Sequence, residues 1–369
     1  MKSHHAKITD FISFLCCPDC KSDLTCRVLD ESEEGQNGFM ECCACENLYP
    51  FQDGIPILMR TGTRNTKFEI NIFEGLKEKS SDPETVKKIN ATITKLEKIK
   101  FTGSWEWDDV AFWDKVYEEN WFKLKSGDSS FFEKKLEERI LQRKNEFEIL
   151  KNKGLEGDLI VEVGAGTATY TEDVLNNYAQ KKYVAVDMSF YGLKVRRDLL
   201  KRNNALYILA SIDNLPFKDN SITCMILIGI LHHSEHKEHT LPSLLSLMGK
   251  NGLLYLDEVL FRPSFLKHSH LKRGENISLH EEYCYKEPLL WHLNQRGSIV
   301  YCKLFNTPFY NLAIKKFLKI VTYSERMYRF VRFLDTLCRK SLGLVFSSCK
   351  AGEIAVIWQN SNLLENFKE

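Results

Sequence analysis

Short runs of apolar residues, each ending in a polar or glycine-containing turn, recur along the central and C-terminal parts of the chain. The two clearest are LIVEV from Leu159 and YVAVD from Tyr183. Further runs begin at Leu206, Ser221, Gly252 and Gly297, and the last is EIAVIWQ near the C-terminus. Apolar runs of this length between turn residues are typical of strands buried in a mostly parallel sheet. The pattern predicts an α/β fold with a doubly wound sheet.

Two other segments carry helical rather than strand patterns. Ser104–Phe122 holds four of the six tryptophans, and its apolar residues recur at approximately helical spacing. We interpret it as a helix packed against the α/β domain, or alternatively as a lid over a bound ligand. Residues 306–349 are a predicted helical insertion before the last strand, and their aromatic side chains make them a second candidate wall of a pocket.

The most informative turn follows the first apolar run. Gly164 and Gly166 flank Ala165, and they let the backbone turn tightly and approach a ligand without a Cβ in the way. The second run ends on Asp187, whose carboxylate is placed to accept hydrogen bonds from ribose hydroxyls. This order of strand, glycine turn, strand and acid predicts a site for an adenosyl ligand.

Two adenosyl ligands fit this turn, a dinucleotide and S-adenosylmethionine. The dinucleotide motif has a third glycine where this chain has Thr169. Glu162, at the end of the first run, suits a ligand with a cationic end better than it suits a diphosphate. The residues favour the methyl donor, with a dinucleotide and a glycine turn without ligand as alternatives.

Three later motifs occur in the order of a known family. They are Leu215-Pro216-Phe217, Asp219-Asn220-Ser221-Ile222 and Leu231-His232-His233. Together with the glycine turn they make residues 140–305 resemble the class I S-adenosylmethionine-dependent methyltransferases, in particular the ubiquinone and menaquinone branch. The resemblance implies a Rossmann-like methyltransferase sheet and methyl transfer from S-adenosylmethionine.

The resemblance also implies which residues contact the cofactor. The implied set is Glu162, Gly164, Ala165, Gly166, Asp187, Met188, Ser211, Ile212, Asp213 and Ile228. Ala168 stands where the family has its third glycine, and Thr223 replaces an aspartate at the start of the fourth strand. Ser211 replaces the acid that usually holds the adenine amino group, with Asp213 as a nearby substitute.

A second signal lies near the N-terminus, where seven of the twelve cysteines precede residue 46. Cys17 and Cys20 form one CxxC pair, and Cys42 and Cys45 form another. Four thiolates directed at one point make a closed tetrahedral Zn²⁺ site, and the polar stretch between the pairs is typical of a hairpin. Disulfides or free thiols are the alternatives, and Cys16 and Cys43 are alternative ligands.

The residues after the second pair carry a further resemblance. Tyr49-Pro50 and Asp53-Gly54-Ile55-Pro56 are similar to the zinc ribbon of tRNA-methyltransferase activator proteins. A structural role for the zinc is expected, because four thiolates leave no open coordination position.

These observations divide the chain into three regions. A zinc ribbon is predicted over residues 1–62, and a linker with a helical, aromatic segment over 63–130. A class I methyltransferase domain is predicted over 131–369, with the helical insertion at 306–349.

Charge argues against a surface built for nucleic acid. The 51 Lys and Arg residues balance 50 Asp and Glu residues, which gives a net charge of +1, whereas nucleic-acid-binding domains are usually strongly basic. A local basic cluster at Lys194–Arg202 is interpreted as a solvated helix face. A nucleic-acid partner is therefore not expected.

The chain has no apolar run of eighteen residues, so we expect no membrane span. No apolar signal sequence precedes the cysteines, so the expected location is cytoplasmic.

The histidines His232, His233, His236 and His239 form a cluster after the fourth predicted strand. A metal site is one interpretation, but the family resemblance places the His pair at the mouth of the pocket. His232 and His233 are therefore candidate catalytic bases or substrate contacts, with Asp257 and Glu258 as alternatives. A base is needed only if the acceptor must lose a proton, and the sequence does not choose among the four.

The leading hypothesis is a methyltransferase for a small-molecule acceptor, acting by direct in-line displacement. The alternative is an RNA base methyltransferase, because some rRNA enzymes also carry an N-terminal zinc ribbon. A binding module that keeps the fold without catalysis is the third hypothesis, and the intact cofactor turn argues against it.

Overall fold

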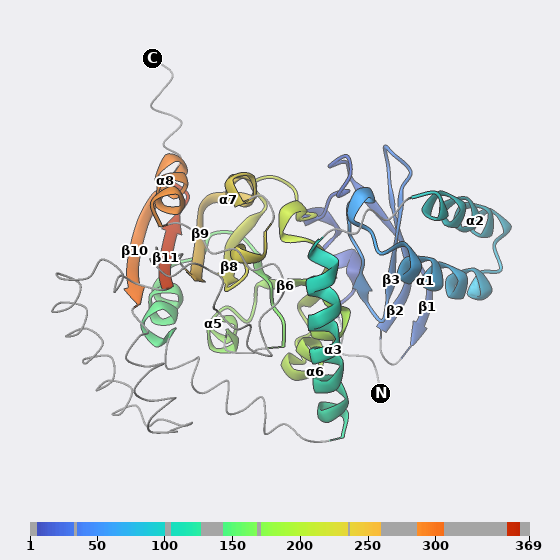
Figure 1. Ribbon diagram of the computed structural model, residues 1–369, viewed down its shortest axis with the longest axis horizontal. Helices are drawn as coiled ribbons and strands as arrows, with labels where there is room; N and C mark the ends of the chain where they lie inside the picture. The colour runs from blue at the N-terminus through green and yellow to red at the C-terminus, as the bar shows by residue number, and fades with distance from the viewer. Residues whose placement is uncertain are drawn as a thin grey trace, which may run out of the picture.

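The computed structural model describes residues 6–32, 35–99, 105–126, 143–167, 171–234, 237–259, 286–305 and 353–361. These residues contain a four-stranded sheet near the N-terminus and a seven-stranded sheet. Figure 1 shows the two sheets next to each other, with the N-terminal sheet at one end of the molecule and β10 and β11 at the other. Among these residues no helix combines the length and the apolar character needed to cross a membrane.

The larger sheet confirms the predicted α/β fold. Its strands are β5 (Leu159–Val163), β6 (Lys182–Asp187), β7 (Ala205–Leu209), β8 (Ile222–Ile228), β9 (Met248–Val259), β10 (Ser298–Phe305) and β11 (Glu353–Gln359). Their spatial order is β10-β11-β9-β8-β5-β6-β7. Neighbouring strands from β9 to β7 run parallel, whereas β11 runs antiparallel to both β9 and β10.

Helices cover both faces of this sheet. Residues 143–152 are helical, and they lie on one face with α5 (Glu172–Asn177) and α6 (Phe190–Leu200). The opposite face carries α7 (Lys237–Ser246) and α8 (Lys286–Arg296). Since both faces are buried, the parallel strands are apolar throughout instead of alternating with polar residues.

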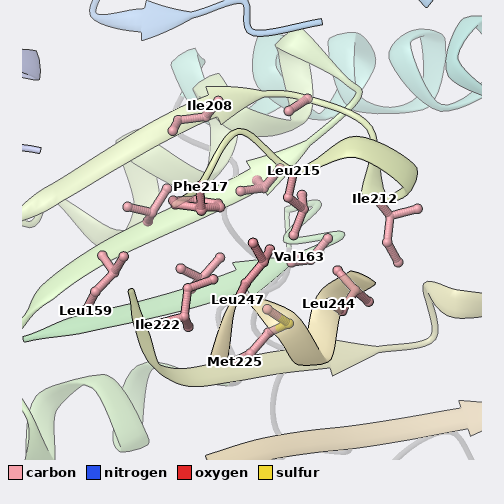
Figure 2. Packing of buried hydrophobic residues seen from close by; sticks show 14 of the residues in the cluster. Leu159, Val163, Ile208, Ile212, Leu215, Phe217, Ile222, Met225, Leu244 and Leu247 are labelled. Atoms are coloured by element: carbon pink, nitrogen blue, oxygen red, sulfur yellow. The ribbon is translucent and has the colours of Figure 1, made fainter. Parts of the chain in front are cut away.

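The core on the α7 face also holds the loop that follows β7. Figure 2 shows Leu215 and Phe217 of that loop among side chains of β5, β8 and α7. Both loop residues are buried, so the Leu-Pro-Phe motif anchors the loop by packing. This packing holds the residues predicted to contact adenine, 211–213, near the carboxyl end of β7.

The N-terminal sheet consists of β1 (Leu24–Ser32), β2 (Gly35–Cys42), β3 (Leu48–Gln52) and β4 (Ile55–Pro56), and its strands pair antiparallel in that order. Two short 3-10 helices precede it, at Ile8–Asp10 and Ile12–Phe14. Directly after β4, Ile57 pairs with Leu209 of β7, and the Leu58 N–H donates to the Leu209 carbonyl at 2.9 Å. The edge strand β7 is thus paired with the N-terminal module, by which we mean the four-stranded sheet with the segments directly before and after it. This pairing covers backbone groups that an open edge would expose.

Between the two sheets in sequence, the described residues contain α1, α2 and α3 in addition to the helical segment 143–152. The helices α1 (Thr66–Lys79) and α2 (Pro83–Glu97) pack on the N-terminal sheet, with side-chain N-caps at Asn65 and Asp82. Helix α3 (Trp105–Lys125) packs instead against α6, and Figure 1 shows it crossing in front of that helix. The predicted insertion at 306–349 lies outside the described residues.

Candidate functional site

The predicted glycine turn follows β5 directly. Gly164 and Gly166 have φ values of 68° and 49°, a conformation that residues with a Cβ disfavour. The N–H groups of Gly164 and Ala165 donate to the Val186 carbonyl at 2.8 and 3.1 Å, which ties the turn to β6. A Cβ added at Gly164 would lie 2.6 Å from the Ile230 side chain. The turn therefore needs glycine both for its conformation and for close packing.

Asp187 ends β6 beside this turn. Its Oδ2 accepts a hydrogen bond from the Gly166 N–H and its Oδ1 one from the Ser189 N–H, both at 2.8 Å. Burial raises the pKa of Asp187, against the opposing effect of these two N–H groups. Each carboxylate oxygen can accept a further hydrogen bond, which suits the predicted contact with two ribose hydroxyls.

The strand order places this turn at a topological switch point. From β5 the sheet grows through β6 and β7 on one side, and through β8 and β9 on the other. In open α/β sheets, ligands bind in the crevice outside the carboxyl ends of the strands at such a point. Gly164 follows β5 and the Leu-His-His motif follows β8, so both lie at the carboxyl ends of neighbouring strands, where this rule places a ligand.

Glu162 lies beneath the turn in a buried polar network. Its Oε2 accepts hydrogen bonds from Thr171 Oγ1 at 2.8 Å and from the Tyr183 hydroxyl at 2.7 Å, and it pairs with Arg196. Glu162 is 3 % exposed and Arg196 is fully buried. These contacts join β5, β6 and α6 under the cofactor turn, while a direct contact between Glu162 and a cofactor ammonium stays a prediction.

The residues predicted to contact the adenine of the cofactor lie at a short 3-10 helix, Ile212–Asn214, which is capped by Ser211. The Ser211 hydroxyl accepts the Asp213 N–H at 3.1 Å. The Asp213 carboxylate accepts from Ser234 Oγ at 2.5 Å and also pairs with Thr240. Asp213 therefore links this loop to the segment after β8, and its predicted contact with adenine is untested.

Two other residues that the resemblance implies for the cofactor lie at the carboxyl ends of strands in the same sheet. Met188 follows β6 and is partly buried, and Ile228 is the last residue of β8 and is 8 % exposed. Their positions are compatible with the role that the resemblance implies.

The structure separates the four candidate bases. The Nδ1 of His232 lies 2.5 Å from Glu258 Oε1, and Glu258 Oε2 accepts the Leu231 N–H at 2.7 Å. Asp257 instead pairs with Arg143 at 2.7 Å, on the helical segment 143–152. Sequence reasoning named these residues without showing that β8 and β9 bring His232 and Glu258 together.

His233 completes this group. Its ring centroid lies 4.2 Å from that of His232. A positive charge on His233 would lower the pKa of Asp187.

Helix α3 approaches the cofactor turn from outside. A Cβ at Gly166 would lie 2.9 Å from the Tyr117 hydroxyl, and one at Gly192 would lie 2.8 Å from the Tyr117 ring. Asp114 Oδ1 accepts a hydrogen bond from Ser189 Oγ at 2.5 Å. Burial raises the pKa of Asp114 to about 6, and the nearby Asp187 charge acts in the same direction. The aromatic segment therefore lies beside the glycine turn, as the lid hypothesis requires.

Residues 161–256 match the family model described as a methyltransferase domain. The central part of this chain is thus similar to methyltransferase domains, and we refer to the unit built on the seven-stranded sheet as the methyltransferase domain. Over 107 residues the chain is 29 % identical to the ubiquinone/menaquinone biosynthesis C-methyltransferase UbiE of Pseudomonas savastanoi and to that of Pseudomonas syringae. The match covers 28 % of this chain and 42 % of each relative, so the chain spans less than half the length of these curated relatives.

Solved structures with a similar arrangement include a Haloferax volcanii complex between a methyltransferase activator and a methyltransferase. It has 15 % identity and a TM-score of 0.43, and the match covers 63 % of this chain and 96 % of that chain. Geranyl diphosphate C-methyltransferase from Streptomyces coelicolor has 11 % identity and a TM-score of 0.43, with 59 % of this chain and 77 % of that chain covered. The family match and the curated relatives support the predicted resemblance to S-adenosylmethionine-dependent methyltransferases.

A second candidate site lies in the N-terminal module, where the structure brings all four predicted ligands together. The sulfur atoms of Cys17, Cys20, Cys42 and Cys45 lie within 4.8 Å of one another. Individual Sγ–Sγ distances are 3.7 Å for Cys17–Cys45 and 3.3 Å for Cys20–Cys42. Four Zn–S bonds of about 2.3 Å in a tetrahedron would require separations of about 3.8 Å. The thiol cluster therefore fits a Zn²⁺ ion.

The two alternative thiols lie apart from this cluster. The Cys16 Sγ donates to the Phe217 carbonyl at 3.1 Å, and Cys43 is exposed.

Hydrogen bonds from Ser22 lower the pKa of Cys20 to about 6, which favours its thiolate form.

A network of hydrogen-bonded polar side chains contacts the four-cysteine cluster. The Tyr49 hydroxyl lies 3.1 Å from Cys17 Sγ and donates to Asp19 Oδ2 at 2.7 Å. Burial opposes ionisation of Asp19, but hydrogen bonds from Thr61, Tyr49 and Asn47 outweigh it and lower the pKa of Asp19. Such partners orient metal ligands, so the Tyr-Pro step has a local role that its sequence pattern did not reveal.

The N-terminal module also contacts the methyltransferase domain next to residues 211–213, which are predicted to contact adenine. Lys21 Nζ donates to the Leu215 carbonyl at 3.0 Å, and Asn214 Nδ2 donates to the Pro18 carbonyl at 2.8 Å. Both Pro18 and Lys21 belong to the first cysteine turn. These contacts were not foreseen, since the residues they join are almost 200 positions apart in sequence.

The prediction that the basic cluster on α6 is solvated is wrong for most of its residues. Arg196 pairs with Glu162 in the core. Lys194 pairs with the Asp53 carboxylate at 2.8 Å, and Arg197 donates to the Asp53 carbonyl at 2.5 Å. The Asp-Gly turn of the N-terminal module therefore covers part of this face. Its carboxylate is the charge partner of Lys194, and its carbonyl accepts a hydrogen bond from Arg197.

Proposed function

We propose that this protein transfers a methyl group from S-adenosylmethionine to a small molecule. The observation that carries the proposal is the glycine turn beside Asp187 at the switch point of the sheet, within a matched methyltransferase domain. The curated relatives are C-methyltransferases of ubiquinone and menaquinone biosynthesis, and this supports a small acceptor.

The residues present fit the cofactor. The turn at Gly164–Gly166 would pass beneath the methionine part, Asp187 would accept the ribose hydroxyls, and the loop at residues 211–213 would border the adenine. S-adenosylmethionine, when bound, supplies an activated methyl group for in-line displacement. The main task of the protein side chains is then to hold the acceptor in line and to exclude water.

Calorimetry with S-adenosylhomocysteine tests the cofactor assignment. We expect Asp187→Ala to weaken binding by about 1.5–3 kcal/mol, as for a hydrogen bond to a charged group. Phe122→Ala is the matched control, because Phe122 is 58 % exposed on α3, and it should bind like the wild type. Tighter binding of NAD than of S-adenosylhomocysteine would refute the assignment.

The acceptor class is tested separately. A surface for RNA would need clustered basic side chains and would bind with a steep salt dependence, whereas the basic cluster of α6 is largely buried in protein contacts. We expect weak binding in a filter assay with total RNA. Tight, salt-sensitive binding accompanied by RNA methylation would favour the RNA alternative.

We further propose that Cys17, Cys20, Cys42 and Cys45 hold one structural Zn²⁺. The closed set of four sulfur ligands supports this role, because a catalytic zinc keeps an open position. Metal analysis of the purified protein should show about one zinc per chain.

A further inference from the structure

We propose that metal binding at the four-cysteine cluster regulates cofactor binding to the methyltransferase domain. The connection runs from the first cysteine turn, residues 16–21, to the cofactor loop, residues 211–218. The inference rests on the proposed function and on the proposed zinc site, and it joins the two by an energetic coupling. Each ligand should bind more tightly when the other is present.

The backbones of the two segments are paired directly before the first proposed metal ligand. Leu15 and Phe217 form an antiparallel bridge. The Cys16 N–H donates to the Pro216 carbonyl at 3.0 Å, and the Cys16 Sγ donates to the Phe217 carbonyl at 3.1 Å. The chain therefore enters Cys17 from a segment that is fixed on the cofactor loop.

Two side-chain hydrogen bonds continue this pairing across the cysteine turn. Asn214 Nδ2 donates to the Pro18 carbonyl at 2.8 Å, and Lys21 Nζ donates to the Leu215 carbonyl at 3.0 Å. Pro18 and Lys21 each follow a proposed metal ligand directly. A shift of either ligand therefore displaces a hydrogen-bond partner of the cofactor loop.

The conformation of the cysteine turn depends on what surrounds it. Lys21 has a φ of 62°, a left-handed conformation that a residue with a Cβ adopts where its surroundings impose it. The Lys21 N–H donates to the Cys17 carbonyl at 2.9 Å, which closes the turn. A metal held by Cys17 and Cys20 would fix this turn from the inside, because both ligands belong to it.

On the other side of the contact, one short turn transmits a displacement to the predicted adenine residues. Asn214 is the last residue of the 3-10 helix Ile212–Asn214, and its N–H donates to the Ser211 carbonyl at 3.2 Å. Leu215 follows directly, and its buried side chain anchors the loop in the core (Figure 2). If the cysteine turn loses its order, cofactor binding must first order this loop, and the apparent affinity falls.

The contacts at the cysteine turn do more than dock the module. Docking is already provided at another place, where Ile57 pairs with Leu209 of β7 and the Asp53 carboxylate pairs with Lys194 of α6. The hydrogen bonds to the cofactor loop instead start beside the proposed metal ligands. This position suits them to report the state of the cluster to residues 211–213.

The experiment uses the full-length protein, zinc and S-adenosylhomocysteine. Competition with a coloured zinc chelator measures the zinc affinity with and without saturating S-adenosylhomocysteine. Calorimetry measures the affinity for S-adenosylhomocysteine in zinc-loaded and chelator-treated protein. We expect S-adenosylhomocysteine to raise the zinc affinity by about 5–150-fold, the usual range of allosteric coupling. Zinc must raise the affinity for S-adenosylhomocysteine by the same factor, because linkage is reciprocal.

A double variant, Lys21→Ala with Asn214→Ala, distinguishes coupling through the cysteine turn from unfolding of the whole chain. It keeps all four cysteines, so it should bind zinc, but most of the coupling should be lost. Asn177→Ala is the matched control, because Asn177 Nδ2 donates to the Lys151 carbonyl at 3.1 Å within the methyltransferase domain. This control should keep the coupling of the wild type.

The outcomes separate the coupling from the proposals on which it rests. A zinc affinity that S-adenosylhomocysteine does not change in the wild type overturns the coupling, and so does a coupling of wild-type size in the double variant. If the double variant does not fold, the two single variants supply the same comparison. Tight S-adenosylhomocysteine binding by a protein that holds no zinc removes the coupling and leaves the methyltransferase function intact. A zinc-loaded protein that binds no S-adenosylhomocysteine overturns the proposed function as well.

Discussion

The N-terminal module and the methyltransferase domain reach a folded core by different routes. The module has four antiparallel strands, one of only two residues, and gathers four thiols into a cluster. The methyltransferase domain instead buries parallel strands between two layers of helices. The smaller module thus combines buried apolar residues with a thiol cluster that could hold a metal, whereas the large sheet is stabilised by apolar burial.

The two regions are nevertheless not independent. Cys17 and Tyr49 of the module belong to the same buried cluster as Val161 of β5. The Leu58 N–H donates to the Leu209 carbonyl of β7, and the Asp53 carboxylate forms an ion pair with Lys194 of α6. The comparison therefore teaches that a small module with a thiol cluster contributes to the core of a domain that follows it in sequence.

The largest effect is expected from loss of the metal. Cys42→Ser should release the zinc and unfold the module, because structural zinc sites contribute roughly 10–16 kcal/mol of apparent binding free energy. Metal analysis and thermal unfolding measure this. Cys43→Ser is the matched control, since Cys43 is an exposed neighbour outside the cluster. Full metal content in a Cys17/Cys42 double mutant would rule out the assigned ligands.

The next effect sharpens the contrast between buried and exposed ion pairs. Arg196→Met should destabilise the methyltransferase domain by about 3–5 kcal/mol, because it leaves the Glu162 carboxylate buried without its charge partner. Arg27→Met in the module should cost less than about 1 kcal/mol, since its pair with Asp82 is 46 % and 42 % exposed. Denaturant unfolding of both variants tests this, and equal losses would contradict it.

A pH effect is expected where α3 meets the cofactor crevice. The pKa of Asp114 is raised to about 6, so α3 docking is favoured below the unfolded value of about 3.9 and weakens as the pH rises through 6. The change should not exceed about 3 kcal/mol, the equivalent of the shift. Trp113 stacks on Tyr117 with centroids 5.5 Å apart, so tryptophan fluorescence reports the docking.

Asp114→Asn supplies the control for this titration. The amide cannot ionise, so the fluorescence of this variant should not change between pH 5 and 7.5. A pH dependence equal to that of the wild type would show that another group titrates. Asp187 and Glu118 are the other carboxylates that act on Asp114.

The smallest effect tests whether the module supports the cofactor loop. Lys21→Ala removes the hydrogen bond to the Leu215 carbonyl and should weaken S-adenosylhomocysteine binding by about 0.5–1.5 kcal/mol. Lys218→Ala is the matched control, because Lys218 forms an exposed pair with Asp23. Identical affinities in the two variants would mean that the cysteine turn and the cofactor loop are energetically independent.

The sequence by itself determined the features that depend on local order. The glycine turn, the acid at the end of β6 and the two CxxC pairs are each specified by residues close together in the chain. Their backbone requirements, positive φ at Gly164 and Gly166 and tight turns at the cysteines, leave few alternatives. The alternation of apolar runs and turns was similarly sufficient to predict the parallel sheet.

The tertiary structure decided which distant residues act together. Glu258 meets His232 across 26 positions because β9 lies beside β8, and Lys21 meets Leu215 across 194 positions because the module docks on β7. Arg196 and Arg197 look like a solvated basic face in sequence but are buried by partners from other elements. Local patterns encode backbone conformation, whereas strand order and docking select the partner of each polar side chain. The partner in turn determines whether that polar side chain is buried and how it contributes to the site or to the core.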